Sequence, residues 1–217
     1  MLVADANQQE IRLAAALSGD KVLLQQLAAG EDLHQVTADL FGVDRDKGKA
    51  INLALNYGMS AYGLENRLGL TEEQADDGIA ARRNKYKVQA AWQDGIVRKA
   101  KKNLKVRSLS GRPIWINPYL QHDGWKRNAM NGPVQGSAAD HTKLALVNMH
   151  QICADDRIPF RTNLVVHDEI VTDVPAGLMV KYKQAMKDAW YEAGVTLAPG
   201  VELPVEMASG KDWGRKK

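Results

Sequence analysis

The chain has 217 residues, a length that suits one large domain or two smaller lobes. Its 29 Lys and Arg and 26 Asp and Glu leave a formal charge of +3, and 45% of its residues are hydrophobic, which excludes a disordered acidic or basic tail. No apolar run is long enough to span a membrane, and the first residues do not resemble a signal peptide. The single cysteine, Cys153, excludes an internal disulfide and favours a reducing, cytoplasmic compartment.

The first part of the chain predicts a short strand followed by helices. Residues 2–4 are apolar and predict the end of a strand, and residues 8–29 have helical apolar spacing with an interruption at 18–20. Asp32 predicts the N-cap of a helix that reaches residue 41, and a further helix is expected over residues 45–57.

The rest of the chain continues this mixed pattern. Thr71 begins a capping box that predicts a long helical region. The Gly132-Pro133 pair predicts a break between two helices, because proline starts helices more readily than it continues them. The expected elements are a helical region at 71–103, a hairpin or loop at 106–115, helices at 124–131 and 133–154, strands within 161–174, a helix at 177–193 and a strand at 201–207.

One face of the helix from residue 45 combines cations with an aromatic ring. Arg45, Lys49, Leu53 and Tyr57 are each four residues apart, so they drift by only about 40° per step and share one face over about 18 Å. This face could hold a polyphosphate at its N-terminal end and a flat group near Tyr57, because helix N-termini attract anions. The alternative is an exposed basic turn followed by core contacts.

Two adjacent carboxylates lie inside the apolar, β-branched stretch 161–174. Burying Asp168 and Glu169 is costly unless a cation offsets their charge, and magnesium prefers carboxylate oxygens. The alternative is a tight turn whose acids face solvent. Asp5 ends the first apolar stretch and becomes informative only if it meets Asp168 in space.

Polar residues around the expected break near residue 132 form a further candidate site. Arg127, Asn131 and Gln135 could contact phosphates or groove acceptors of a nucleic acid, or they could serve only as caps and interhelix bonds. The aromatic residues do not form an interleaved stacking array, and they are interpreted as packing residues: Tyr62, Trp92, Trp115 and Trp125.

Taken together, the motifs resemble those of the family A (polymerase-I-like) DNA polymerases. Residues 5–12, DANQQEIR, resemble motif A, usually DYSQIELR, and residues 45–58, RDKGKAINLALNYG, resemble motif B, usually R-x3-K-x3-F/Y-x3-YG. Residues 109–112, LSGR, resemble the TLxGR segment, residues 131–140, NGPVQGSAAD, resemble N-x-P-x-QGTAAD, and residues 166–169, VHDE, resemble motif C. The resemblance covers essentially the whole chain in order, and five motifs in register are highly specific.

The resemblance implies a right-hand polymerase architecture that lacks the thumb. The expected fold is α+β, with mostly helical fingers and a small antiparallel palm sheet. The resemblance places the palm at residues 1–30, the fingers at residues 31–125 and a second part of the palm at residues 126–217.

The resemblance also implies a two-metal site. Asp5, Asp168 and the backbone carbonyl of Ala6 are expected to hold two Mg²⁺ ions, so the usual tyrosine at position 6 is not needed for binding metal. Glu169 is expected to act as the auxiliary acid near the primer end. The implied reaction is template-directed transfer of a deoxynucleotide to a primer 3′-hydroxyl.

Substrate contacts follow from the same resemblance. Glu10 is expected to close the sugar pocket against a 2′-hydroxyl, and this disfavours the alternative of a related RNA polymerase. The alternative of a reverse transcriptase is disfavoured because the sequence of residues 167–169, HDE, differs from the YxDD of that class. The residues expected to bind the dNTP are His34, Arg45, Lys49, Leu53 and Tyr57, with Tyr57 at the base-insertion site. The residues expected to contact primer-template DNA are Arg127, Asn131, Gln135 and His167.

Two departures from the family pattern affect the substrate pocket. Leu53 stands where the family usually has Phe or Tyr, which puts sugar discrimination and incorporation rate in doubt, and leucine here is found among phage-type members. Gln9 replaces a usually apolar residue.

Family members carry a thumb and an early palm segment before motif A, whereas four residues precede Asp5 here. We therefore expect a second chain or a missing N-terminal segment to supply the thumb and the rest of the palm. The expected setting is the cytoplasm of a bacterium or a phage-infected host cell, with no membrane partner. The alternative to a catalytic module is a non-catalytic DNA-binding or interaction fragment.

Overall fold

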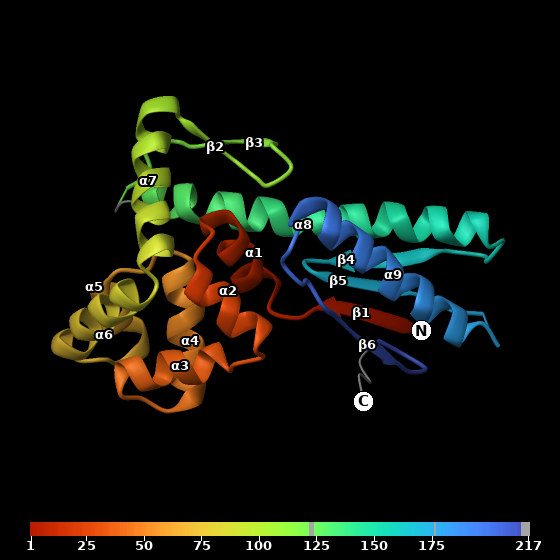
Figure 1. Ribbon diagram of the computed structural model, residues 1–217, viewed down its shortest axis with the longest axis horizontal. Helices are drawn as coiled ribbons and strands as arrows, with labels where there is room; N and C mark the ends of the chain where they lie inside the picture. Colours follow the sequence, from red (N-terminus) through yellow and green to blue (C-terminus); the bar gives the residue numbers. More distant parts are fainter. Residues whose placement is uncertain (122–123, 176, 214–217) are drawn as a thin grey trace. The chain divides into compact units, whose positions relative to one another are not determined.

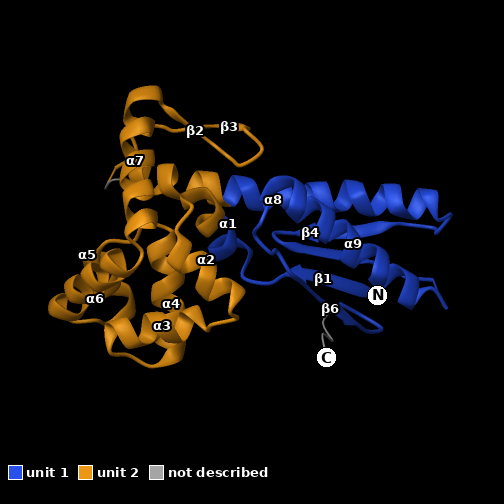
Figure 2. Ribbon diagram, in the orientation of Figure 1, with its two compact units in different colours: residues 1–13, 135–217 blue, residues 14–134 orange. Residues whose placement is uncertain are grey.

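The chain forms two compact units. The computed structural model describes residues 1–121, 124–175 and 177–213. Unit 1 contains residues 1–13 and 135–217, and unit 2 contains residues 14–134 (Figure 2). The boundaries fall inside two helices, α1 (Gln9–Ser18) and α8 (Gly124–Asp155). The expected palm and fingers segments, which divide the chain after residues 30 and 125, stay a prediction.

Unit 1 is built on a four-stranded antiparallel sheet. Its strands are β1 (Leu2–Ala6), β4 (Thr162–Val166), β5 (Glu169–Thr172) and β6 (Val205–Ser209), in the order β4-β5-β1-β6 (Figure 1). Because β1 is a central strand, Leu2, Val3 and Ala4 are all buried. Leu2, Ala4 and Ile170 pack against residues of α8 and of α9 (Met179–Leu197) in one core. The α+β class that the sequence predicts is confirmed.

A buried polar cluster fastens the start of α1 to α8 within unit 1. The Gln9 side-chain amide donates to Nδ1 of His141 at 2.9 Å, and His141 Nε2 lies 3.3 Å from the carbonyl oxygen of Trp190. These contacts require a neutral imidazole that accepts at Nδ1 and donates from Nε2. Burial lowers the pKa of His141 to about 4, which keeps the ring neutral.

Unit 2 is mainly helical, and short polar side chains begin most of its helices. Asp20, Asp32, Asp44 and Ser60 cap helices, and Thr71 forms a capping box with Gln74. The helices are α2 (Lys21–Ala28), α3 (Leu33–Phe41), α4 (Arg45–Asn56), α5 (Ala61–Leu68), α6 (Glu72–Lys85) and α7 (Lys87–Asn103), followed by a hairpin of β2 (Lys105–Arg107) and β3 (Pro113–Trp115) and by the first turns of α8.

The helices α3 and α4 pack at very short range because residue 48 is glycine. A Cβ on Gly48 would lie 2.6 Å from the Ala38 Cβ and 2.6 Å from the His34 carbonyl oxygen. Phe41, Ile51 and other apolar residues of α3 to α6 fill the core around this contact. The spacing between α3 and α4 therefore depends on Gly48.

The expected helix break at Gly132-Pro133 is wrong, because α8 runs through both residues. Gly132 lies against the hairpin, where an added Cβ would be 3.4 Å from methyl groups of Val106 and Ile114. Pro133 removes one helical hydrogen bond, but this loss does not end α8, because tertiary packing can stabilise a helix that contains a proline. The expected helices at 124–131 and 133–154 are thus one helix.

The single helical region expected at 71–103 is two helices, and α5 was not expected at all. The backbone leaves the helical conformation at Tyr86, whose hydroxyl donates to Gln26 Oε1 at 2.8 Å. The carboxylate of Asp20 accepts from the amides of Val88 and Gln89 at the start of α7. The signal for this helix start therefore lies more than sixty residues away along the chain.

The interpretation of Tyr62 and Trp115 as packing residues is also wrong. Tyr62 is 75% exposed and Trp115 is 73% exposed, whereas Trp125 packs against the cluster between α7, the hairpin and α8. No helix among the described residues is long and apolar enough to cross a membrane.

The buried His141 makes stability depend on pH. Its folded pKa of about 4 lies below the unfolded value of 6.5, so the unfolded chain binds more protons between these values. The free energy of unfolding should therefore decrease as the pH falls from 6.5 toward 4, by up to about 1.4 kcal/mol per pH unit from this group. Urea denaturation at several pH values measures it. In the double variant Gln9→Leu/His141→Leu, the decrease in the free energy of unfolding per pH unit should be smaller by this amount. An equal decrease in the variant and the wild type would contradict the lowered pKa of His141.

The close contact at Gly48 should make that position intolerant of a side chain. Gly48→Ala forces a Cβ into Ala38 and the α3 backbone, so we expect the free energy of unfolding to fall by about 1–3 kcal/mol. Gly95→Ala is the matched control, since the nearest atom to its added Cβ is Arg98 Nη2 at 3.8 Å, and it should stabilise α7 by about 0.5–1 kcal/mol. Equal stability of the two variants in urea would refute the packing argument.

Candidate functional site

Unit 1 brings the predicted metal-binding residues together at one edge of its sheet. We call Asp5, Ala6, Asp168 and Glu169 the acidic edge. His167 and Asp168 form the two-residue turn between β4 and β5, and the Ala6 amide donates to the Asp168 carbonyl oxygen at 3.2 Å. His167 has φ = 55°, a left-handed conformation that suits a tight hairpin. Asp5 and Asp168, far apart in sequence, therefore lie on adjoining backbone segments.

The strand register decides which way the acidic edge faces. Asp5 is opposite Glu169 on β5 and opposite Glu206 on β6, so three carboxylates occupy one row across the sheet. The neighbouring residues Ala4 and Ile170 point to the other face and join the helix-covered core. Like charges in such a row repel each other, and a bound cation would relieve the repulsion. Sequence reasoning missed Glu206, which also accepts from the Asn7 side chain.

Glu169 is more constrained than a solvent-facing turn residue would be. It is buried, and its Oε1 accepts from the indole nitrogen of Trp213. The alternative of a tight turn whose acids face solvent therefore does not hold for Glu169. Asp168, in the turn itself, is half-buried. The pattern of the sequence contained no signal for the contact with Trp213.

The donor set of the acidic edge suits magnesium. The carboxylates of Asp5 and Asp168 and the carbonyl of Ala6 are oxygen ligands, which Mg²⁺ prefers alongside water and substrate phosphates. Among the described residues no group of three or more His, Cys, Asp or Glu side chains is already gathered as a metal cage. The Ala6 side chain is in the core, which leaves its backbone carbonyl as the group it could offer.

Two other predicted residues of unit 1 lie on helices. Glu10 is in the first turn of α1, where its charge matches the helix dipole. The neighbouring Gln9, which departs from the family pattern, turns its amide toward Ala138 and His141 of α8. Gln135 is exposed on α8 about one turn before Ala138. Gln9 thus serves to anchor α1 in the buried interior.

Unit 2 carries the predicted phosphate-binding face. Arg45 and Lys49 are exposed on α4 and Leu53 and Tyr57 are half-buried, whereas Ile51 and Leu55 on the other side are in the core. We call the first four residues the cationic face. Tyr57 lies just past the end of the helix as its C-cap. The common face that the four-residue spacing predicts is therefore the accessible face of α4.

His34 lies behind the cationic face at the start of α3. It is buried, and its Nδ1 lies 3.3 Å from the side-chain nitrogen of Asn52 on α4. Burial lowers the pKa of His34; the charge of Asp32 opposes this, and the cations Lys49 and Arg45 add to it. A neutral ring that accepts from Asn52 at Nδ1 carries its proton on Nε2, which could donate to a phosphate oxygen.

Arg45 is held by a partner that sequence reasoning assigned only as a helix cap. Its Nε donates to Asp32 Oδ2 at 2.5 Å, and this hydrogen bond lowers the pKa of the Asp32 carboxyl. Both side chains are exposed, so the ion pair contributes little to stability. It orients the guanidinium of Arg45 beside His34, because Asp32 also accepts from the His34 amide.

The end of α4 lies against the first turns of α8. Gly58 has φ = 74°, and a Cβ there would lie 2.2 Å from Met130 Cε and 3.6 Å from Arg127 Cγ. One turn from Arg127, the Oδ1 of Asn131 is buried with no hydrogen-bond partner among the described residues. Unit 2 therefore brings Gly58, and with it the end of α4, near Arg127.

A buried arginine supports the same end of α4. The guanidinium of Arg82 on α6 donates to Asn56 Oδ1 at 2.9 Å and lies 5.7 Å from the centre of the Tyr86 ring. Burial lowers the pKa of Arg82 to about 10. Sequence reasoning missed this residue, because a basic helix residue is usually solvated.

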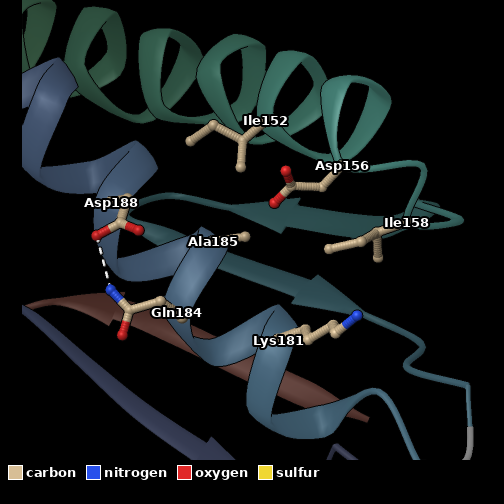
Figure 3. Close-up of a pocket in the computed structure, with 7 residues that line it drawn as sticks. All are labelled: Ile152, Asp156, Ile158, Lys181, Gln184, Ala185 and Asp188. Carbon is tan, nitrogen blue, oxygen red and sulfur yellow. Dashed lines mark hydrogen bonds between the residues drawn. The ribbon is translucent and has the colours of Figure 1, made fainter.

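A hollow in unit 1 lies away from these residues. It measures about 330 Å³ and is open between the C-terminal part of α8 and the first half of α9 (Figure 3). Its lining combines apolar and charged side chains, and Gln184 donates to Asp188 within it at 2.8 Å. None of the predicted site residues lines the hollow.

The comparisons with known proteins agree with the motifs. The family model for DNA polymerase family A matches residues 1–215. The chain is 33% identical to DNA polymerase I of Lactococcus lactis subsp. lactis (strain IL1403) and 32% identical to that of Bacillus subtilis (strain 168), in each case over 98% of this chain and 26% of the relative. The chain thus spans about a quarter of the length of these relatives.

A solved structure shares the fold. The POL domain of Pol1 from M. smegmatis, in complex with DNA primer-template and dNTP, matches with a TM-score of 0.87 and 30% identity, over 98% of this chain and 39% of that one. Because the family model matches nearly the whole chain, the chain belongs to DNA polymerase family A.

Proposed function

We propose that the chain is the catalytic part of a DNA-directed DNA polymerase, acting as a partial or split module. The observation that carries this proposal is the acidic edge, where the hydrogen bond from the Ala6 amide to the Asp168 carbonyl oxygen joins the end of β1, which carries Asp5, to the turn that carries Asp168. The relative solved with primer-template DNA and dNTP supports the same substrates here. The proposed setting is the cytoplasm of a bacterium or a phage-infected cell.

The acidic edge would bind the ions. Asp5, Asp168 and the Ala6 carbonyl would hold two Mg²⁺, which when bound would lower the pKa of the primer 3′-hydroxyl and neutralise charge on the triphosphate and the departing pyrophosphate. Glu169, kept in place by Trp213, would orient the primer end.

The other predicted residues would hold the substrates. Arg45, Lys49 and His34 would donate to the triphosphate, while Leu53 and Tyr57 would contact the sugar and base. Glu10 would exclude a 2′-hydroxyl. The DNA would be held by the remaining predicted contacts, Arg127, Asn131, Gln135 and His167, partly through minor-groove acceptors that look alike in every base pair.

The chain covers about a quarter of its curated relatives, so we propose that an additional segment or chain supplies the thumb and the remaining palm. The same coverage favours a second candidate function, a non-catalytic fragment that only binds DNA. Primer extension by the chain alone and together with the product of the adjacent upstream reading frame separates the two. Folded protein that extends no primer in either case would support the second candidate.

Removing one metal ligand should abolish synthesis. Asp168→Asn keeps the shape of the turn and removes one negative charge, so we expect primer extension to fall about 1,000-fold while DNA binding is retained. Asp156→Asn is the control, because this exposed acid on unit 1 is not part of the acidic edge. Extension by Asp168→Asn at the control rate would exclude the metal assignment.

The cationic face should affect nucleotide binding. Lys49→Ala removes one phosphate donor, and we expect kcat/KM for dNTP to fall about 10- to 100-fold. Lys47→Ala removes the same charge from the other side of α4, where the amine donates to the Gly69 carbonyl, and should change kcat/KM by less than about twofold. Steady-state extension kinetics measures both variants. An equal loss of kcat/KM in Lys49→Ala and Lys47→Ala would mean that nucleotide binding depends on the total charge of α4 and not on the cationic face.

A further inference from the structure

Unit 2 contains a buried cation that is not compensated by an opposite charge. Arg82 on α6 is 7% exposed, and no carboxylate among the described residues lies within ion-pair distance of its guanidinium. Burial lowers the pKa of Arg82 to about 10, so the side chain still carries its charge at neutral pH. Because an uncompensated buried charge lowers the stability of a fold, packing alone does not explain this residue.

The hydrogen bonds of Arg82 are incomplete as well. Its guanidinium donates to Asn56 Oδ1 at 2.9 Å, but Arg82 Nε and Asn56 Nδ2 are buried with no hydrogen-bond partner in the part of the chain that the structure describes. A polar pair that is only partly satisfied is less stable than apolar residues of the same volume. Such costly local choices occur mainly at positions that serve function.

The contact reaches α4 immediately before the predicted base-insertion site. Asn56 is the last residue of the helix, and Tyr57 follows as its C-cap. The backbone then turns at Gly58, whose amide donates to the Leu55 carbonyl oxygen at 3.0 Å. A side chain of α6 therefore holds the end of α4 one residue before Tyr57.

Arg82 is itself held on its other side by α2. Its guanidinium lies 5.7 Å from the centre of the Tyr86 ring, and the Tyr86 hydroxyl donates to Gln26 Oε1 at 2.8 Å. All three of these side chains are buried. Because a guanidinium is planar and stacks on aromatic rings, this arrangement fixes both the distance and the direction of the bond to Asn56.

We propose that Arg82 is a positioning residue, which holds the end of α4 through Asn56 so that the Tyr57 ring is oriented toward the base of the incoming nucleotide. The inference rests on the proposed function, since that function gives Tyr57 its role. Arg45 lies eleven residues before Asn56, about 16 Å along the helix. Loss of Arg82 should therefore weaken the contact with the base and leave the contact with the phosphates unchanged.

A double variant separates positioning from stability. Arg82→Met/Asn56→Leu removes both polar partners at similar volume, so the free energy of unfolding in urea should equal or exceed that of the wild type. The amides of residues 57–59 should nevertheless exchange their hydrogens at least about tenfold faster, because the end of α4 is no longer held. Asn56→Asp keeps the acceptor and adds a counter-charge, so its exchange rates should stay within about twofold of the wild type.

The control is Arg83→Met on the same helix, which removes an exposed arginine that pairs with Asp94 at 2.7 Å. This variant should leave the exchange of residues 57–59 unchanged, because a surface ion pair contributes little. Faster exchange in Arg83→Met, equal to that in the double variant, would assign the effect to the charge of α6 and overturn the proposal.

Ligand binding tests the role toward the nucleotide without any synthesis. Isothermal titration calorimetry of the whole chain compares dATP with inorganic tripolyphosphate, each with Mg²⁺. The double variant should bind dATP about three- to tenfold more weakly than the wild type, which is the range expected for a lost aromatic contact, and tripolyphosphate within about twofold. Equal weakening of both ligands would indicate a general disturbance of α4 and would contradict the positioning role.

Wild-type exchange rates or wild-type dATP affinity in a stable double variant would also refute the proposal. If the double variant does not fold, Arg82→Lys decides, because it keeps the charge and loses the planar guanidinium; unchanged exchange and dATP affinity in this variant would refute the role of Arg82. A wild type that binds neither ligand would reject the proposed nucleotide site together with this role. Unchanged variants of a wild type that binds both would reject this role alone.

Discussion

The pairing of β1 with β5 on one side and β6 on the other is the constraint on which unit 1 depends. The backbone groups of the five-residue strand β1 form hydrogen bonds with both neighbouring strands. The register of this pairing determines which side chains of β1 enter the core. Ala4 and Ala6 meet the helices, whereas Asp5 lies on the opposite face. A slip of one residue would put Asp5 into the apolar core. The register that builds the core therefore also positions the candidate metal ligands.

Unit 2 reaches a comparable result through helix packing. The missing side chain at Gly48 lets α3 and α4 approach closely, so His34 on one helix lies beside the cations on the other. Asp32 caps α3 and also holds Arg45, so one carboxylate links the helix start to the cationic face. The position of Arg45 and His34 is thus set by helix geometry that apolar packing maintains.

Local patterns predicted much of this arrangement. The four-residue spacing from Arg45 identified the accessible face of α4, and the two predicted caps, Asp32 and Thr71, begin the helices that they indicated. The failures involve partners distant in sequence: the start of α7 is capped by Asp20, and Gly132-Pro133 stays helical against the hairpin. The contact of Glu169 with Trp213 and the burial of Arg82 also depend on tertiary packing. Such contacts leave no periodic trace in a single sequence.

The bond between Gln9 and His141 has a consequence for how the sequence can change over time. The Gln9 amide supplies the donor to Nδ1 of the buried His141, so replacing Gln9 alone by an apolar residue would leave that acceptor without a partner. Two apolar residues of similar volume would fit without that penalty, and an apolar residue is usual at position 9 in the family. Positions 9 and 141 are therefore epistatically coupled, and evolutionary exchange between the polar and the apolar pair should occur by paired substitutions.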